Sequence, residues 1–505
     1  MKKANEIQNR KLTADELPRV RIADADFPAP FRSGLEYSSP ARGTWNIVHT
    51  GMLIPEAHEI FVCAAGCLRG VVLTAAEMGA QDRFSTVAVR ENNLLDGDME
   101  DLVIEGVTDI LNKLPERPPA VLVYTSCVHH FTGTDLDLIY RTLSERFPDI
   151  DFTDCYMNPI MRKSGLTPDQ LMRSRLYMLL HEREKDPKAV AIIGNDLPTD
   201  EDSDLMKVLR GAGLKVHEIT SCRTYAEYQE MAESSVYISY YPDAAPGGDM
   251  LAERLGGTHY ALKFSFDYDE IDETFAGLAE VLGIEARRKD EIAMNRKQCE
   301  EEIKKTKELI GDMPVSIDYT YCPRPFGLAK LLLDHGFRVE KVYADSIPGG
   351  DRAAFEALKK EHPDLLIYPT VHAGMRFANT ANAARGSDLL TGGAAGSSQK
   401  SLPRCHARCE MSAARGSNET AAGSDPLTGR AAGPPQTKEE ILALGQKAAY
   451  FDDTDRFVNV VEGGGMIGYE AVTRTMELMR DAYVNRKEMK ELVQVKGLGC
   501  EICNR

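Results

Sequence analysis

Short apolar segments alternate with amphipathic segments along most of this chain. The apolar segments are rich in β-branched residues, which is typical of buried strands, and include 86–89, 120–124, 189–194, 215–219, 235–239, 314–319 and 339–344. The segments between them have helical periodicity and include 98–111, 135–147, 204–211, 224–234, 248–255, 327–335 and 351–361. Strands separated by helices of about 10–15 residues predict βαβ units with parallel sheets. We therefore expect an α/β protein made of three Rossmann-like domains.

The same pattern predicts where these domains begin and end. Residues 1–40 are polar and contain four prolines, so we expect an N-terminal arm rather than a core element. Three α/β domains are predicted at 41–185, 186–290 and 291–505. Within the third, residues 379–435 are rich in Ala, Gly and Ser and lose all periodicity, which predicts a disordered insertion.

Composition and charge narrow the class of protein. A chain of 505 residues with 43% hydrophobic residues is neither collagen-like nor wholly disordered. It has no apolar run of about 18 residues and no apolar segment after its charged start, so we expect a cytoplasmic protein with no membrane partner. The net charge of −18 argues against nucleic acid as a partner. Eleven cysteines, an odd number, do not indicate a disulfide framework in a reducing compartment.

Three cysteines stand where chemistry is expected. Cys127 follows a predicted buried strand, and α/β proteins present functional groups at the carboxyl ends of their strands. Cys63 and Cys67 are four residues apart, so both can face one side of a helical turn. Thiolates suit iron–sulfur clusters or zinc, while the alternative is that these are small buried residues. Gly70 stands where a CxxxCxxC motif would need its third cysteine, which excludes that motif.

Three segments resemble the nitrogenase component 1 family. HEIFVCAAGCLRGVVLTAAEMG is similar to the first cluster-ligand helix of that family, VLVYTSCVHHFTGTDLDLIY to its second ligand loop, and EGGGMIGYEAV to its closing segment. The resemblance covers nearly the whole chain apart from the insertion and agrees with three Rossmann-like domains. It implies a subunit of a nitrogenase-like oxidoreductase that accepts electrons from an ATP-dependent iron–sulfur reductase. ATP would be used by that partner, and the sequence does not name the substrate.

The resemblance also assigns roles to individual residues. It implies that Cys67 is the central cluster ligand and Cys127 the later one. The usual earlier ligand would fall near 39–44, where no cysteine occurs, and Cys63 is expected to replace it. This departure favours a 4Fe–4S cluster over the larger P-cluster. Cys155 is expected to line the cluster cavity, with a place in the core as the alternative.

The active-site cofactor of nitrogenase proper is not expected here. The resemblance places its cysteine and histidine ligands near Tyr240–Tyr241 and near Val461–Glu462, and neither ligand is present. No molybdenum–iron cofactor is therefore expected. The family also implies either a homodimer or a heteromer with a component 1-like sister subunit. Two other roles remain open, a scaffold for metallocluster assembly and a non-catalytic partner subunit that holds no metal.

Other motifs are weaker. His129 and His130 follow Cys127 and could hydrogen-bond a cluster or relay protons, although ordinary loop positions explain them equally. The glycines of Gly463–Gly468 satisfy GxGxxG, but no strand with an acidic end follows, so we expect them to let the backbone pass close to a cavity or to the first domain. Cys405–Cys409 could form a metal clip, and Cys500–Cys503 is a CxxC pair open to metal binding or redox pairing.

Overall fold

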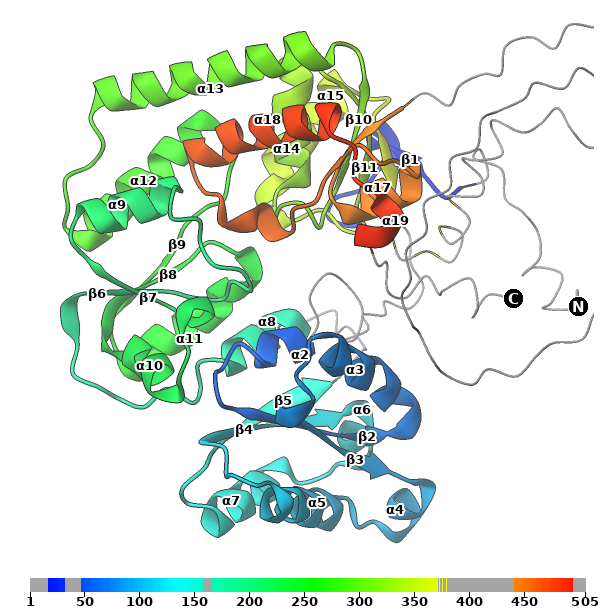
Figure 1. Ribbon diagram of the computed structural model, residues 1–505, viewed down its shortest axis with the longest axis vertical. Coiled ribbons are helices and arrows are strands. Elements are labelled where there is room, and N and C mark those ends of the chain that lie inside the picture. Colours follow the sequence, from blue (N-terminus) through cyan, green and yellow to red (C-terminus); the bar gives the residue numbers. More distant parts are fainter. Residues whose placement is uncertain are drawn as a thin grey trace, which may run out of the picture.

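The computed structural model describes residues 17–31, 47–157, 166, 168–370, 372, 375, 378 and 440–493. The predicted insertion, the Cys405–Cys409 pair and the terminal Cys500–Cys503 pair lie outside the described residues. The described part contains three sheets built almost wholly from parallel strands, which confirms the predicted α/β class (Figure 1). No helix in these ranges is both long enough and apolar enough to cross a membrane.

The first sheet has four parallel strands in the order β3-β2-β4-β5. They are β2 (His58–Ala64), β3 (Phe84–Val89), β4 (Ala120–Ser126) and β5 (Asp151–Met157). Helix α3 (Ala65–Glu77) packs on one face, and α5 (Met99–Lys113) and α7 (Leu136–Arg146) pack on the other (Figure 1). Short helices α2 (Ile47–Gly51), α4 (Glu91–Asp96) and α6 (Cys127–Thr132) complete this domain. Because both faces are covered, every residue of β4 is buried.

The second sheet, also parallel, has the order β7-β6-β8-β9. Its strands are β6 (Asp186–Ile192), β7 (Lys215–Glu218), β8 (Ser234–Ser239) and β9 (Thr258–Ala261). Its helices are α9 (Asp204–Gly211), α10 (Tyr225–Glu230), α11 (Ala245–Leu255) and α12 (Tyr268–Leu282), and α8 (Pro168–Arg175) leads into it from the first domain. Alternate residues at the end of β6 face opposite ways. Val190 and Ile192 enter a core shared with the third domain, whereas Ala191 and Ile193 enter one shared with the first.

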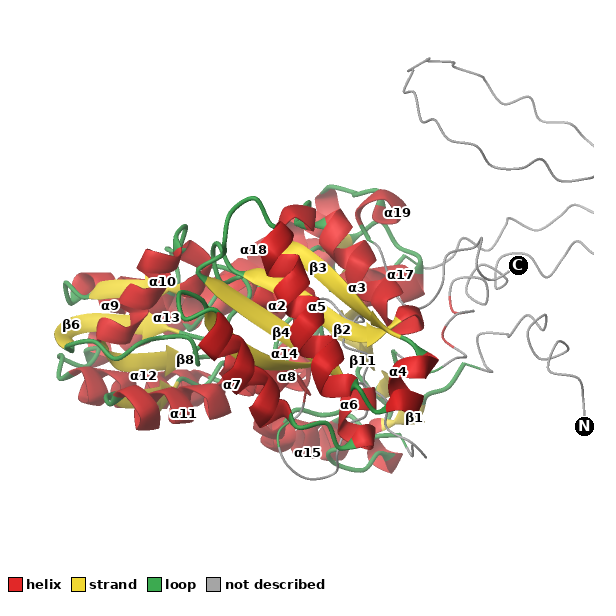
Figure 2. Cartoon of the chain, turned by 90° about the horizontal axis from the view of Figure 1, so that it is seen from below, coloured by secondary structure: helices red, strands yellow, loops and turns green. Residues whose placement is uncertain are grey.

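The third sheet has the order β1-β12-β11-β10-β13-β14. Its strands are β1 (Val20–Arg21), β10 (Pro314–Asp318), β11 (Arg338–Tyr343), β12 (Leu366–Tyr368), β13 (Leu442–Leu444) and β14 (Phe457–Val458). Its helices are α13 (Lys289–Ile310), α14 (Pro325–Asp334), α15 (Arg352–Glu361), α17 (Gln446–Asp452), α18 (Tyr469–Val484) and α19 (Met489–Leu492), and helices cover the sheets on both sides (Figure 2). Part of the predicted arm belongs to this sheet, because β1 pairs antiparallel with β12 and Ile22 is fully buried.

The glycines of Gly463–Gly468 bring the third domain against the second. Gly465 has φ +75°, and its carbonyl accepts the Asp200 N–H at 3.1 Å. A Cβ on Gly465 would lie 2.3 Å from the Pro198 carbonyl oxygen. The expectation of a close backbone approach is confirmed, but the neighbour is the second domain and not the first.

Replacing Gly465 by alanine is expected to destabilise the protein by at least about 2 kcal/mol, because the side chain meets both a left-handed backbone and a carbonyl oxygen. The control is Gly464→Ala. Gly464 has φ +59°, but its Cβ would meet only methyl groups of flexible side chains, Val460 at 3.0 Å and Met466 at 3.7 Å. Thermal unfolding of both variants separates the cost of a side chain on a left-handed backbone from the cost of the contact with the Pro198 carbonyl oxygen. Equal losses of stability in the two would show that the contact with the second domain contributes nothing.

Candidate functional site

Three cysteines gather at the carboxyl-terminal edge of the first sheet. Cys63 is the next-to-last residue of β2, and Cys67 lies in the first turn of α3, which follows directly. Cys127 begins α6, directly after β4. Because β2 and β4 are parallel neighbours, their carboxyl ends meet at one edge. The thiols of Cys67 and Cys127 both act electrostatically on Cys63, so the three side chains are neighbours.

The three thiols differ in burial and in the ease with which they ionise. Cys63 is buried, and burial raises its pKa to about 12, with smaller contributions from Cys67 and Cys127. Cys127 is half-buried, and burial and Cys67 raise its pKa while the backbone N–H groups of Cys127 and Val128 oppose the shift. Cys67 is exposed. The expected helical turn from Cys63 to Cys67 is wrong, because Cys63 lies in a strand and only Cys67 in the helix.

Cys155 lies deeper in the same domain. It is fully buried in β5, opposite Tyr124 of β4, which in turn pairs with Phe61 of β2. Cys63 is two residues beyond Phe61 on the same face of the sheet. Cys155 therefore lies on the same face as Cys63, two strands away and farther from the carboxyl-terminal edge. Burial and the charges of Asp154 and Glu59 raise its pKa well above the usual value, and its thiol hydrogen-bonds Tyr124.

His129 has a structural role. Its Nδ1 accepts the Ser126 N–H at 3.1 Å and so caps α6, and the ring is buried, which lowers its pKa. Glu100 of α5 acts on it electrostatically, so the ring lies toward α5, on the opposite face of the sheet from Cys63. Its neighbour His130 is exposed and lies beside Phe131, with ring centroids 6.0 Å apart.

Exposed apolar side chains lie on α3 and α6, the helices that hold Cys67 and Cys127. Val72 and Leu73 follow Cys67 on α3, and Phe131 follows Cys127 on α6. Phe131 is 69% exposed, which is unusual for a large apolar residue. Exposed apolar groups beside a functional edge are typical of surfaces that bind another protein. No sequence pattern predicted this surface, the apolar rim (Val72, Leu73 and Phe131).

A second group of polar residues is buried at the carboxyl edge of the second sheet. Its centre is Arg173 of α8, which is 1% exposed. The guanidinium donates to the Gly194 carbonyl at 2.6 Å, to Asp196 Oδ2 at 2.5 Å and to Asp169 Oδ2 at 3.0 Å. It also stacks on the Tyr241 ring, 4.4 Å from its centroid. Three hydrogen bonds and an aromatic face therefore hold this one cation in place.

Glu462 completes this buried group from the third domain. Its Oε1 lies 3.8 Å from the Arg173 guanidinium, and its carboxyl group hydrogen-bonds Asp196. Burial and the charge of Asp196 raise the pKa of Glu462 to about 9. Tyr241 and Glu462 stand at the two positions where the resemblance places the cofactor ligands of nitrogenase proper. The structure thus brings those two positions together around an arginine, which the sequence analysis did not predict.

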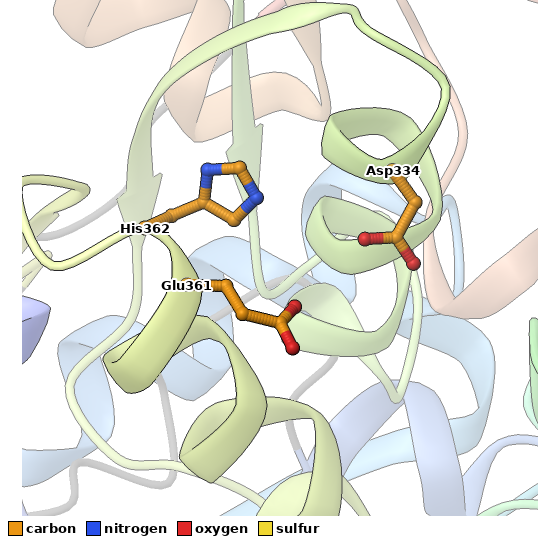
Figure 3. A group of neighbouring side chains, drawn as sticks. All are labelled: Asp334, Glu361 and His362. Carbon is orange, nitrogen blue, oxygen red and sulfur yellow. The ribbon is translucent and has the colours of Figure 1, made fainter.

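A third group lies on the surface of the third domain. Asp334 at the end of α14 and Glu361 and His362 at the end of α15 have ligand atoms within 4.8 Å of one another (Figure 3). However, the Lys330 ammonium bonds Asp334 Oδ2 at 2.5 Å and interacts with Glu361. The cation at this group is therefore a lysine of the chain itself.

Comparison with known proteins agrees with this architecture. The family described as nitrogenase component 1 type oxidoreductase matches residues 48–405, more than two thirds of the chain. The chain belongs to this family. The resemblance predicted from its sequence is thereby confirmed, although the closing segment at 462–472 lies beyond the matched range.

Similarity to a solved structure covers a larger part of the chain than the family match does. A structure titled "Nitrogenase Cp1 at pH 6.5" is 12% identical, covers 90% of this chain and 94% of its own, and has a TM-score of 0.57. A second, titled "Nitrogenase Cp1 at pH 5", is 14% identical over 70% of this chain and 80% of its own, with a TM-score of 0.47. No curated protein matches the sequence. The first of these structures shows that the two chains share a fold, which makes this member a highly divergent one.

Proposed function

We propose that this protein is a subunit of a nitrogenase-like oxidoreductase that works in the cytoplasm. Cys63, Cys67 and Cys127 would hold an iron–sulfur cluster, which accepts electrons from an ATP-dependent iron–sulfur reductase and passes them to a substrate. The observation that carries this proposal is the gathering of the three thiols at one strand edge. The seven cysteines in the described ranges are free thiols, which suits a reducing compartment.

The spacing of the thiols supports a cluster rather than a single ion. A Zn–S bond of about 2.3 Å puts the sulfurs of a tetrahedral zinc site about 3.8 Å apart. Among the described residues only Asp334, Glu361 and His362 bring three ligand atoms within 4.8 Å of one another, so at least one pair of the three sulfurs is farther apart. Ligands of a 4Fe–4S cluster bind different irons and are spread more widely. Such a cluster would supply one-electron transfer at this edge.

The chain's own residues would set the conditions for this cluster. Burial of Cys63 excludes water from one side, and the N–H groups of Cys127 and Val128 stabilise a thiolate at Cys127. Bound iron would reverse the effect of burial on these thiols, because a metal cation favours the deprotonated form. Cys155 would line the wall behind the cluster together with Phe61 and Tyr124, without binding iron.

The exposed side of the site supports a partner subunit. Cys67 is exposed, and the apolar rim lies on the same helices. A second component 1-like subunit, either a copy of this chain or a sister, would cover this edge and supply the remaining ligand. The reductase would deliver electrons to the assembled pair.

The test is the iron and sulfide content and the EPR spectrum of anaerobically purified protein. Cys63→Ala, Cys67→Ala and Cys127→Ala are each expected to lose most of the iron, because three thiolates leave no spare ligand. Cys155→Ala is expected to keep it. Cys222→Ala is the matched control, since this half-buried thiol of the second domain bonds only the Glu218 carbonyl.

The outcome also separates the alternative roles. Wild type that holds no iron, alone or with a co-purifying partner, would contradict the proposal and leave a non-catalytic subunit. Iron that moves to another apoprotein without any turnover would indicate an assembly scaffold. Retention of iron in all three cysteine variants would show that the cluster lies elsewhere.

A further inference from the structure

Glu462 is held by one domain and reaches into another. Its backbone N–H donates to the Thr320 carbonyl at 2.8 Å, and that of Gly463 donates to the Tyr321 carbonyl at 2.7 Å, both in the third domain. Its side chain instead contacts Arg173 and Asp196 at the edge of the second sheet. The residue has φ +52°, a conformation that non-glycine residues rarely adopt. The backbone therefore presents this carboxyl group at a cost in local strain.

The charges around Glu462 do not balance unless a proton is present. Arg173 is the cation that faces it, from α8. The other ionisable groups that interact with Arg173 or with Glu462 come from α8 and from the segments after β6 and β8, and they are Asp169, Asp196, Tyr240, Tyr241 and Asp243. Four carboxyl groups, counting Glu462, around one guanidinium leave three charges uncompensated if all ionise, and a proton on Glu462 relieves part of this repulsion.

The same edge also holds an unsatisfied acceptor. Asn195 is 4% exposed, and its Oδ1 has no hydrogen-bond donor among the described residues, although its Nδ2 donates to Glu218 Oε1 at 2.6 Å. The Glu462 side chain is 13% exposed, so it is not sealed from solvent. A buried, unpaired acceptor at the same strand edge as a partly exposed acid suits the binding of a polar ligand.

We propose that Glu462 is the proton donor of the reduction, with Asp196 and Arg173 as its positioning residues. This inference rests on the proposed function, because it needs an electron source. A reduction that adds hydrogen requires one proton for each electron, and the thiols of the proposed cluster supply none. The carboxyl edge of the second sheet, where α/β proteins bind their ligands, is where Glu462 meets Asp196.

The step balances with the reductant already named. The cluster, when bound, would supply one electron for each proton. At Glu462 the O–H bond of the carboxyl group breaks, and its proton forms a new bond to the substrate as the substrate is reduced. With protons as the only acceptor, two electrons and two protons form one molecule of hydrogen. The Glu462 carboxylate is left with the electron pair and stays paired with Arg173. A proton from solvent, taken up at the exposed side of the Glu462 carboxylate, restores the acid.

Burial and the charge of Asp196 support this role, since they raise the pKa of Glu462 to about 9. An acid of this kind is protonated at neutral pH, as a general acid must be. It also gives the proposal a direct readout, because a protonated carboxyl group has its own infrared band.

The experiment compares wild type with Glu462→Gln, which keeps the size of the side chain and a donor toward Asp196 but has no acidic proton. Glu470→Gln is the matched control, because Glu470 is a partly buried glutamate of α18 whose neighbours do not include Arg173. Three quantities are measured: iron content, the infrared band of a protonated carboxyl group at pH 7.5, and hydrogen evolution with the reductase and ATP, with protons as the only acceptor.

We expect Glu462→Gln to keep its iron, lose one carboxyl band and evolve hydrogen at least about 100-fold more slowly, as loss of a general acid does. Glu470→Gln should match wild type in hydrogen evolution. In Asp196→Asn, the fall in rate with rising pH should move to lower pH, because loss of the neighbouring charge lowers the pKa of Glu462, which a merely structural role would not cause.

The two proposals fail in different ways. Wild type without iron contradicts the proposed function whatever Glu462 does. Iron-loaded wild type that evolves hydrogen, with Glu462→Gln within about threefold of it, overturns the proton-donor role alone. Iron-loaded wild type that evolves none overturns both roles. An unchanged infrared band in Glu462→Gln shows that Glu462 is ionised and also overturns the donor role.

Discussion

Replacing Arg173 by alanine is expected to lower the free energy of unfolding by about 3–5 kcal/mol. The arginine is buried, and its guanidinium is the partner of Asp196, which is also buried. Removing the cation leaves that carboxylate without its charge partner in a low-dielectric environment, together with the Gly194 carbonyl oxygen. The ring of Tyr241 loses its stacking partner as well. A loss of this size would unfold a large fraction of molecules under conditions that wild type tolerates.

Urea unfolding followed by circular dichroism measures this effect. Arg296→Ala is the control, because Arg296 also pairs with two carboxylates, Asp269 and Asp272, but is one-third exposed and should cost about 1 kcal/mol or less. Arg173→Lys should fall between the two, since it keeps the charge but cannot reproduce the planar fork. If Arg173→Ala lost no more than Arg296→Ala, the buried group would have no special role in stability.

Stability should fall as the pH rises from 6 to 9. Glu462 should contribute over this whole range, whereas Glu470, whose pKa burial raises to about 7, should contribute only up to about pH 7. In the folded protein the pKa of Glu462 is raised to about 9, whereas in the unfolded chain it has the ordinary value of about 4.5. Between these values the folded state binds one more proton than the unfolded state. The stabilisation is therefore complete at low pH and is lost as the pH rises toward 9, at up to about 1.4 kcal/mol per pH unit.

The comparison with Glu462→Gln isolates this contribution. Its stability should depend less on pH over the same range, because glutamine does not titrate. Burial lowers the pKa of His58 from 6.5 to about 4, so this residue makes stability rise with pH up to about 6.5, which is opposite in sign and cannot imitate the effect. Parallel curves for wild type and Glu462→Gln would contradict the raised pKa.

Regular elements with strong periodicity were predictable from the sequence. The predicted helix at 204–211 matches α9 residue for residue, and the strand at 215–219 differs from β7 by one residue. Strands β1 and β13, of two and three residues, were missed. Such short strands carry no pattern of their own, and only their pairing with β12 and β10 makes them strands.

The candidate site was predictable in part. Cys127 follows a buried strand that the sequence pattern reveals, and the resemblance pointed to Cys63 and Cys67, although the strand end that holds Cys63 was expected to be a helical turn. The group around Arg173 was not predictable, because Arg173 and Glu462 are nearly 290 residues apart and meet only when the domains assemble. One signal was present in the sequence. Glu462 precedes three glycines and lies near the position where the resemblance places a cofactor histidine, which this chain lacks.

The middle sheet has a consequence for how the molecule comes apart. Val190 and Ile192 of β6 enter one core, and Ala191 and the following Ile193 enter another, so each outer domain shares one of its cores with the middle domain. Unfolding of the middle sheet would expose apolar surface in both neighbours at once, so its unfolding is expected to be coupled to theirs. Local unfolding near the three thiols is therefore expected to disturb the packing around Glu462 through the shared cores, even though the two sites lie on different sheets.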